Sequence, residues 1–133
     1  MRIRWLLIIW TLLAIAALLI RFVALGPSEA LGTAYALLSF VLVAGFGAVL
    51  NQRVRSAHRA ADPATWEHVT TVPGLGSGYY NNFRELGWLN MPASTVPPAV
   101  QPLWRQARRF LLVAAAWFVT TPVVAIAVSA GGA

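Results

Sequence analysis

The run FLLVAAAWFVTTPVVAIAVSA, residues 110–130, contains no charged side chain and decides how the whole chain is interpreted. Two further apolar runs, Trp5–Leu25 and Thr33–Leu50, precede it. The hydrocarbon core of a bilayer is about 30 Å thick, and about 20 helical residues cross it. A helix is the structure expected there because it satisfies its backbone polar groups within one segment. The three runs predict an all-α integral membrane protein with three transmembrane helices.

The composition favours this interpretation over a soluble bundle of three helices. Of the 133 residues, 59% are hydrophobic and 11% are charged, which lies outside the usual range of soluble domains. Helices of a soluble bundle need polar outer faces, whereas Leu12–Ile20 and Phe110–Val119 are apolar on every side. The chain has no cysteine, which excludes disulfides, thiolate zinc sites and iron–sulfur clusters.

The distribution of arginine predicts the topology. Arg2 and Arg4 precede the first run, the turn Gly26–Gly32 has no arginine, and Asn51–Arg109 has seven. Because arginine-rich loops stay in the cytoplasm, we expect the N-terminus inside and the C-terminus outside. Residues 1–50 would form two transmembrane helices with a short outside turn, residues 51–109 a cytoplasmic segment rich in arginine and aromatic residues with short helices, and residues 110–133 the third transmembrane helix with a short outside tail.

The type of basic residue suggests the source. All ten basic residues are arginine and alanine is abundant, which is typical of a GC-rich bacterial genome, so the bacterial inner membrane is the expected location. The first run resembles the start of a signal peptide, but Arg21 interrupts it before any clear cleavage site. We therefore expect an uncleaved anchor.

Charged and aromatic side chains beside the runs are expected to meet lipid headgroups. A juxtamembrane arginine is attracted to anionic lipid by about 1 kcal/mol, and tryptophan favours the interface. These interface residues are Arg2, Arg4, Arg21, Arg53, Arg55, Arg105, Arg108, Arg109, Trp5 and Trp104. For Arg21 a second interpretation stays open, in which it faces the carboxylate of a ligand or partner. The placement of charge beside the runs gives no reason to expect a nucleic acid partner.

The middle segment contains signals for short helices. Gln52–Ala61 is expected to extend the second helix, and Asp62 followed by Pro63 predicts the N-cap and first residue of another helix. Pro73–Gly78 predicts a loop, and a short helix over Phe83–Leu86 would end at Gly87. The proline-rich stretch Pro92–Pro98 predicts extended chain, after which the third long helix begins near Pro98.

Candidate chemistry in this segment is weak. Gly74–Gly78 lacks the lysine and the preceding strand of a phosphate-binding loop. His58 and His68 lie near Asp62 and Glu67, but two histidines on separate short helices do not supply a complete metal site. The chain shows no arrangement of nucleophile, base and acid typical of an enzyme. We therefore predict no catalytic activity, no cofactor, no metal and no small-molecule substrate.

Two features predict contacts with other proteins. Small residues one helical turn apart let helix backbones approach closely in lipid, and the expected packing residues are Ala44, Gly45, Gly47, Ala48, Ala116, Thr120 and Pro122. Pro122 should also kink the third helix. A cluster of large side chains in the middle segment, Tyr79, Tyr80, Phe83, Trp88 and Met91, is expected to contact a partner protein, or alternatively to lie on the headgroups.

From Asp62 onward the chain resembles universal stress protein B and related small bacterial membrane proteins. The matching positions are Asp62-Pro63, Trp66, Asn81-Asn82, Leu86 and Arg105–Arg109, and they cover about half of the chain. The first apolar run is additional to the two-span pattern of that family. The resemblance implies a small integral membrane protein without enzyme activity.

The combined expectation is a non-catalytic accessory or assembly subunit that packs against a larger inner-membrane complex. Membrane lipids and other integral membrane subunits are its expected partners. A respiratory or photosynthetic complex would fit as host, although no residue selects one. The alternative is a stress-related small membrane protein that acts alone or as a homo-oligomer.

Overall fold

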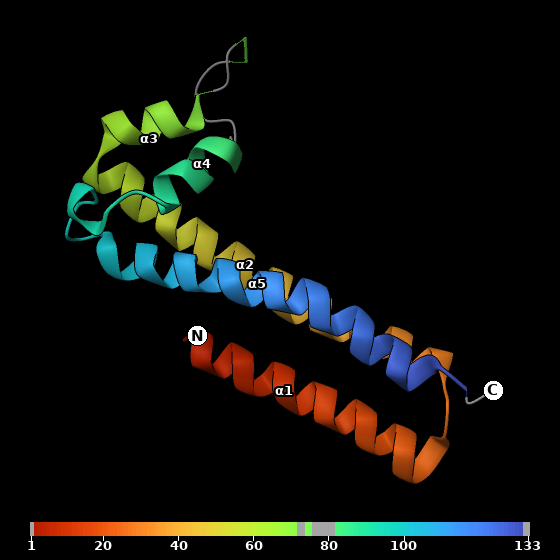
Figure 1. Cartoon of the computed structure of the whole chain (residues 1–133). Helices are drawn as coiled ribbons and strands as arrows, with labels where there is room; N and C mark the ends of the chain where they lie inside the picture. The colour runs from red at the N-terminus through yellow and green to blue at the C-terminus, as the bar shows by residue number, and fades with distance from the viewer. Residues whose placement is uncertain (1, 72–73, 76–81, 132–133) are drawn as a thin grey trace. The chain divides into compact units, whose positions relative to one another are not determined.

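The structure, a computed structural model, describes residues 2–71, 74–75 and 82–131 (Figure 1). Its regular elements in these residues are all helices, and the longest are α1 (Ile3–Leu19), α2 (Glu29–Ala61) and α5 (Gln101–Ser129). The shorter elements are the π-helical continuation η1 (Ile20–Leu25), α3 (Pro63–Thr70), α4 (Asn82–Leu89) and the 3-10 turn η2 (Ala93–Thr95).

The prediction of three helices of transmembrane length is confirmed. Ile3–Leu25, Glu29–Ala61 and Gln101–Ser129 contain 23, 33 and 29 residues, and each is apolar enough to cross a membrane. At about 1.5 Å per residue, all three exceed the hydrocarbon thickness of about 30 Å. Length and composition together are those of a multi-pass membrane protein.

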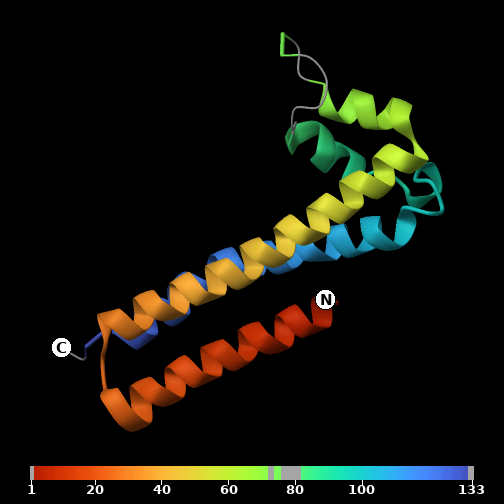
Figure 2. The same cartoon turned by 180° about the vertical axis from the view of Figure 1, so that it is seen from behind.

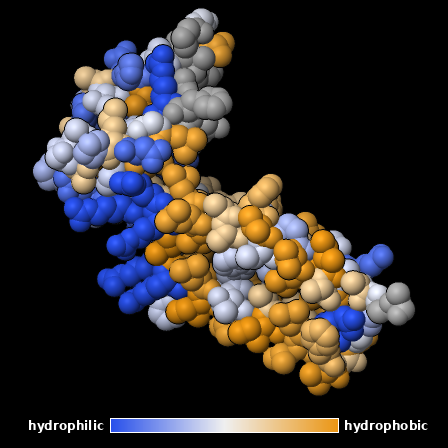
Figure 3. Space-filling view, viewed as in Figure 1, coloured by the Kyte–Doolittle hydropathy of each residue, from blue (hydrophilic) through white to orange (hydrophobic). Residues whose placement is uncertain are grey.

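The chain divides into two compact units. We call Met1–Ala48 with Phe110–Ala133 the apolar unit, and Val49–Arg109 the polar unit. Hydrophobic residues dominate the visible surface of the apolar unit, whereas hydrophilic residues gather on the polar unit (Figure 3). The two boundaries between the units fall close to Leu50, where the second apolar run ends, and to Phe110, where the third begins.

Three helices form the core of the apolar unit. Ala17 of α1, Tyr35 of α2 and Val128 of α5 are buried together, with leucines and alanines of the same helices packed around them. The turn at Gly26, which has a φ of 69°, brings the chain from η1 back along α1 into α2 (Figure 2). Ser28 then starts α2, because its hydroxyl accepts a hydrogen bond from the Leu31 amide at 3.2 Å.

Small residues let α2 and α5 approach closely. A Cβ on Gly32 would collide with the Ser129 hydroxyl and would lie 2.8 Å from the Ala125 carbonyl oxygen. A Cβ on Gly47 would lie 2.8 Å from the Phe110 ring. Gly47 therefore packs within the chain, and Gly32, which the sequence analysis did not select, does the same.

The remaining predicted packing residues lie on open faces. Ala44, Gly45 and Ala48 are exposed along one face of α2, and no atom lies within 4 Å of a Cβ built on Gly45. Ala116, Thr120 and Pro122 of α5 are also exposed. The small-residue positions therefore divide into an internal group and an uncovered group.

The helix α5 continues through Pro122 without interruption from Gln101 to Ser129. Proline has no amide hydrogen to donate to the Phe118 carbonyl, four residues earlier. The Thr120 hydroxyl donates instead to the Ala116 carbonyl at 2.8 Å, so it does not replace the missing donor. Trp117 is turned toward α2, where its Nε1 donates to the Ser39 hydroxyl at 3.2 Å.

The short helices of the polar unit agree partly with the sequence signals. The prediction for α3 is confirmed, because the Asp62 carboxylate accepts from the Thr65 amide at 3.2 Å and Pro63 is the first helical residue. The predicted end of the next helix at Gly87 is wrong, since α4 runs to Leu89. Trp88 and Leu89 are both buried, so their packing carries the helix beyond the glycine.

Candidate functional site

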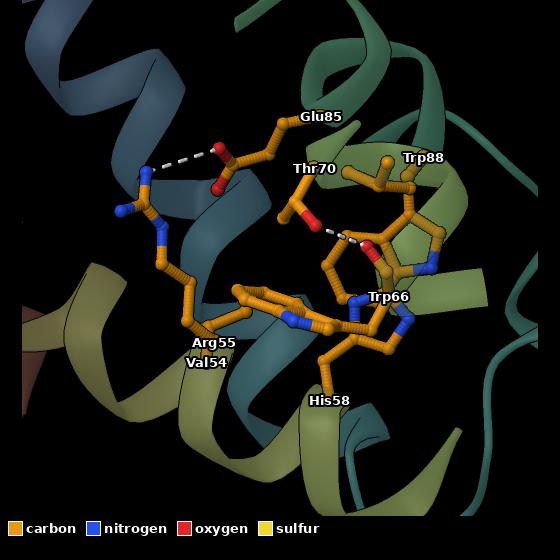
Figure 4. Close-up of a pocket in the computed structure, with 8 residues that line it drawn as sticks. Val54, Arg55, His58, Trp66, Thr70, Glu85 and Trp88 are labelled. Carbon is orange, nitrogen blue, oxygen red and sulfur yellow. Dashed lines mark hydrogen bonds and ion pairs between the residues drawn. The ribbon is translucent and has the colours of Figure 1, made fainter. Parts of the chain in front are cut away.

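A small cavity in the polar unit lies between α2, α3 and α4 (Figure 4). Its free volume is about 10 Å³, which is about the space that one water molecule needs. Eight residues line it: Val54, Arg55, His58, Trp66, Val69, Thr70, Glu85 and Trp88. The cavity brings a histidine, an ion pair and two tryptophans together.

His58 is the most enclosed polar side chain of this cavity, with 1% of its surface exposed. It follows Leu50 and Val54 at intervals of four residues, so it continues their buried stripe on α2. The imidazole stacks on Trp88 of α4 with centroids 4.1 Å apart and planes 6° apart. It also meets Trp66 of α3 edge-on, at 5.8 Å and 85°. One imidazole thus joins three helices.

The electrostatic surroundings favour neutral His58. The residue lies beyond the apolar run that ends at Leu50, and its Nε2 is buried without a hydrogen-bond partner. Burial lowers the pKa of His58 below 6.5, because the charged imidazole loses its hydration. The charge of Asp62 opposes this shift but does not overcome it.

An ion pair joins α2 to α4 on another side of the cavity. The Arg55 guanidinium lies 3.6 Å from the Glu85 carboxylate, and Glu85 is nearly buried. The position of Arg55 beside the second apolar run predicts a place among the headgroups, whereas in the structure its guanidinium faces Glu85. Substitution of Arg55 would leave this carboxylate without its cation in a region of low solvent access.

Further hydrogen bonds hold α4 against the end of α3. The Arg84 guanidinium donates to the carbonyls of His68 at 2.9 Å and Thr71 at 3.1 Å. Carbonyls at the end of a helix have no partner within the helix, so a cation there is stabilising. The Thr70 hydroxyl donates to the Trp66 carbonyl at 2.8 Å, as drawn in Figure 4.

Trp104 differs from its expected place among the headgroups. Its ring is 2% exposed, and its Nε1 donates to the Trp88 carbonyl at 3.3 Å. The Arg108 guanidinium covers the ring at 4.9 Å, and Gln101 donates to the carbonyls of Ala93 and Val96. A buried indole needs a hydrogen-bond acceptor, and the end of α4 supplies one. Trp104 is therefore a core residue of the polar unit.

The residues of the predicted partner-contact cluster do not all lie at the surface. Trp88 is 3% exposed and stacks on His58, so it is not a surface residue, whereas Met91 is 46% exposed. Tyr79 and Tyr80 and the side chain of Phe83 lie outside the described residues. Of this cluster, the structure leaves Met91 as the described surface position.

Other predicted interface residues are at the surface. Arg2, Arg4, Arg53, Arg105, Arg108, Arg109 and Trp5 are exposed, and the Arg4 guanidinium lies 5.9 Å from the centre of the Trp5 ring. Arg21 is half-buried within η1 and donates to the Ala130 carbonyl at 3.0 Å. It therefore satisfies a carbonyl just after the end of α5, a role the sequence analysis did not consider.

Within the described residues, no group of three or more histidine, aspartate and glutamate side chains gathers as metal ligands would. The chemistry that the cavity offers is the uptake of one water molecule or of a proton at His58. Comparison with protein-family models, with curated proteins and with solved structures gave no match. The resemblance to universal stress protein B stays a prediction.

Proposed function

We propose that the chain is a non-catalytic accessory or assembly subunit of a larger complex in the bacterial inner membrane. The supporting observation is the open small-residue face of α2, formed by Ala44, Gly45 and Ala48. Hydrocarbon offers little hydrophobic drive for helix association, so close backbone approach at small residues supplies contact energy. The internal glycines Gly32 and Gly47 already serve this purpose within the chain, and the open face is suited to a helix from another chain.

The proposed orientation follows from charge. We place the N-terminus and residues 51–109 in the cytoplasm, and the C-terminus outside, because arginine is concentrated in that middle segment. The exposed arginines of the polar unit would then face anionic headgroups of the inner leaflet. A reporter enzyme that works only outside the cytoplasm should be active when it is fused after Ala133, and one that works only in the cytoplasm should be inactive there. Activity of the cytoplasmic reporter would contradict this orientation.

Recovery of partners from the membrane tests the proposed function. The full chain, solubilised in mild detergent, should bring with it another integral membrane protein in fixed proportion. Gly45→Leu should abolish that recovery, because the new side chain fills the open face, where a Cβ meets nothing within 4 Å. Ala127→Leu is the matched control, since Ala127 is an exposed small residue outside the face.

Crosslinking in native membranes separates this proposal from the alternative. Adducts with a second type of chain, lost in Gly45→Leu and retained in Ala127→Leu, would support an accessory subunit. Adducts only between copies of this chain would instead favour a homo-oligomeric membrane protein of the stress-related type. A chain that yields neither kind of adduct and purifies alone would contradict both forms of assembly.

A further inference from the structure

We propose that His58 is a proton-sensitive clamp, which holds α3 and α4 against α2 while its imidazole is neutral and releases them when it is protonated. The proposal concerns the polar unit alone and does not depend on which partner the apolar helices meet. It rests on the position of one buried imidazole between three helices, and on the charges that surround it.

The geometry makes His58 the shared contact of these helices. Its ring lies face to face with Trp88 of α4 and edge-on to Trp66 of α3, while its own backbone belongs to α2. The residue is 1% exposed and Nε2 is unpartnered, so a proton on Nε2 would have no acceptor within the described residues. The cavity beside it has room for about one water molecule, too little to hydrate a cation.

The nearby charges do not replace that hydration. On α2, Arg55 lines the same cavity and would repel an imidazolium. On α4, Glu85 lines it too, but its carboxylate already pairs with Arg55. On the side of α3, Asp62 attracts the imidazolium, whereas Glu67 and His68 are exposed. A cation stacked on Trp88 would be attracted to the ring, and burial outweighs the attraction of Asp62.

The direction of the pH effect follows from these observations. Burial lowers the pKa of His58 in the closed arrangement, and hydration would return it toward 6.5 once α3 and α4 move away. The open arrangement therefore binds more protons than the closed one as the pH falls through that value. Closure is favoured above it and is progressively lost below it. The polar unit would respond to acidification of its aqueous compartment.

Hydrogen exchange of the full chain in lipid nanodiscs tests the proposal. Exchange should be compared at about pH 7.5 and about pH 5.5, on either side of the usual histidine pKa, after correction for the intrinsic effect of pH. We expect amides of α3 and α4 to exchange several times faster at the lower pH, with α1 unchanged. Equal protection of α3 and α4 at both values would overturn the proposal.

Two variants assign the effect to one imidazole. His58→Phe keeps a flat ring between the tryptophans and cannot be protonated, so α3 and α4 should stay protected at both pH values. His68→Gln removes the other histidine, which is exposed on α3, and should leave the pH response as in the natural chain. A pH response that persists in His58→Phe, or disappears in His68→Gln, would contradict the clamp.

Direct titration keeps the proposal testable if His58→Phe does not fold. The carbon-13 NMR signal of the His58 imidazole, assigned by comparison with His68→Gln, should titrate below the usual histidine pKa of about 6.5. The opening of α3 and α4 should follow the His58 titration. If His58 titrates at or above that value, or if it titrates while α3 and α4 remain protected, the clamp does not exist.

Discussion

The apolar and polar units differ in where their backbones approach closely. In the apolar unit, α2 meets α5 at glycines, as at Gly32 against Ser129 and Gly47 against Phe110, and the Phe46 and Phe110 rings are 5.5 Å apart. In the polar unit, a Cβ on Gly74 or Gly87 would meet nothing within 4 Å, and contact depends on buried rings such as His58 with Trp88, which stack at 4.1 Å. In water, burial of an aromatic ring is itself favourable, whereas in lipid the outer face of a helix is already in an apolar solvent. We call the first kind of contact packing by shape, because small residues let helix backbones fit closely together. We call the second packing by burial, because large rings are removed from water.

Of the variants that test this comparison, Trp104→Ala should lose the most stability. The ring is buried and its N–H is bonded to Trp88, so we expect the polar unit to lose about 3–5 kcal/mol of stability. Urea unfolding followed by the exchange of α4 amides measures the loss, and α1 should keep its protection. Trp5→Ala is the control, because that ring is 49% exposed and its loss should be small. If the two substitutions reduced stability equally, Trp104 would not be a core residue, and its predicted place among the headgroups would be favoured.

Gly32→Ala tests packing by shape in the apolar unit. The added Cβ would meet a backbone carbonyl of α5 as well as the Ser129 side chain, so α5 must shift. The expected cost is about 1–3 kcal/mol, as for other overpacked positions. Gly45→Ala adds the same methyl group where nothing lies within 4 Å, so it should be neutral or should stabilise the helix by up to about 1 kcal/mol.

Thermal unfolding in detergent, followed by circular dichroism, compares these two glycine variants. A lower midpoint for Gly32→Ala with an unchanged or higher midpoint for Gly45→Ala is the expected pattern. Equal midpoints would mean that the close approach of α2 to α5 contributes little to stability.

The sequence predicted the long helices well, because their signal is local. Apolar runs, in which Arg21 is the single charged residue, define Trp5–Leu25, Thr33–Leu50 and residues 110–130, and the α3 cap at Asp62 depends on neighbours within three residues. Helix ends that depend on tertiary packing were harder to predict from the sequence. Gly87 is a local stop signal, yet α4 continues because the next two residues are buried.

The candidate site was the least predictable part. Tryptophan beside an apolar run is compatible with a headgroup position and with a protein core, and only the tertiary structure places Trp104 in a core. His58 did carry a signal, since it follows Leu50 and Val54 at helical spacing. That spacing marks a buried face but does not reveal which rings cover it.

Arg21→Met tests a polar contact inside the apolar unit. The variant loses the hydrogen bond to the Ala130 carbonyl beyond the end of α5, which we expect to cost about 0.3–1 kcal/mol. Arg21→Lys, which retains the charge, should lose less in the same thermal unfolding measurement. If Arg21→Met instead prevents recovery of a partner while the midpoint stays unchanged, the arginine faces a carboxylate of that partner.

Asp62 variants should give the smallest effect, because its cap concerns a single turn of α3. Hydrogen bonds that the Asp62 carboxylate accepts from the Thr65 side chain and, to a smaller extent, from the Thr65 backbone amide lower the pKa of Asp62 below 3.8. A carboxylate with a lowered pKa stabilises the folded state above its unfolded value, and this contribution is lost as the pH falls through the folded one. Exchange of the Thr65 amide should therefore accelerate in acid. Asp62→Asn, which caps nearly as well, should protect that amide without the pH dependence, and Asp62→Ala should expose it throughout. An amide that Asp62→Ala leaves protected would show that packing of Trp66, rather than the cap, determines where α3 begins.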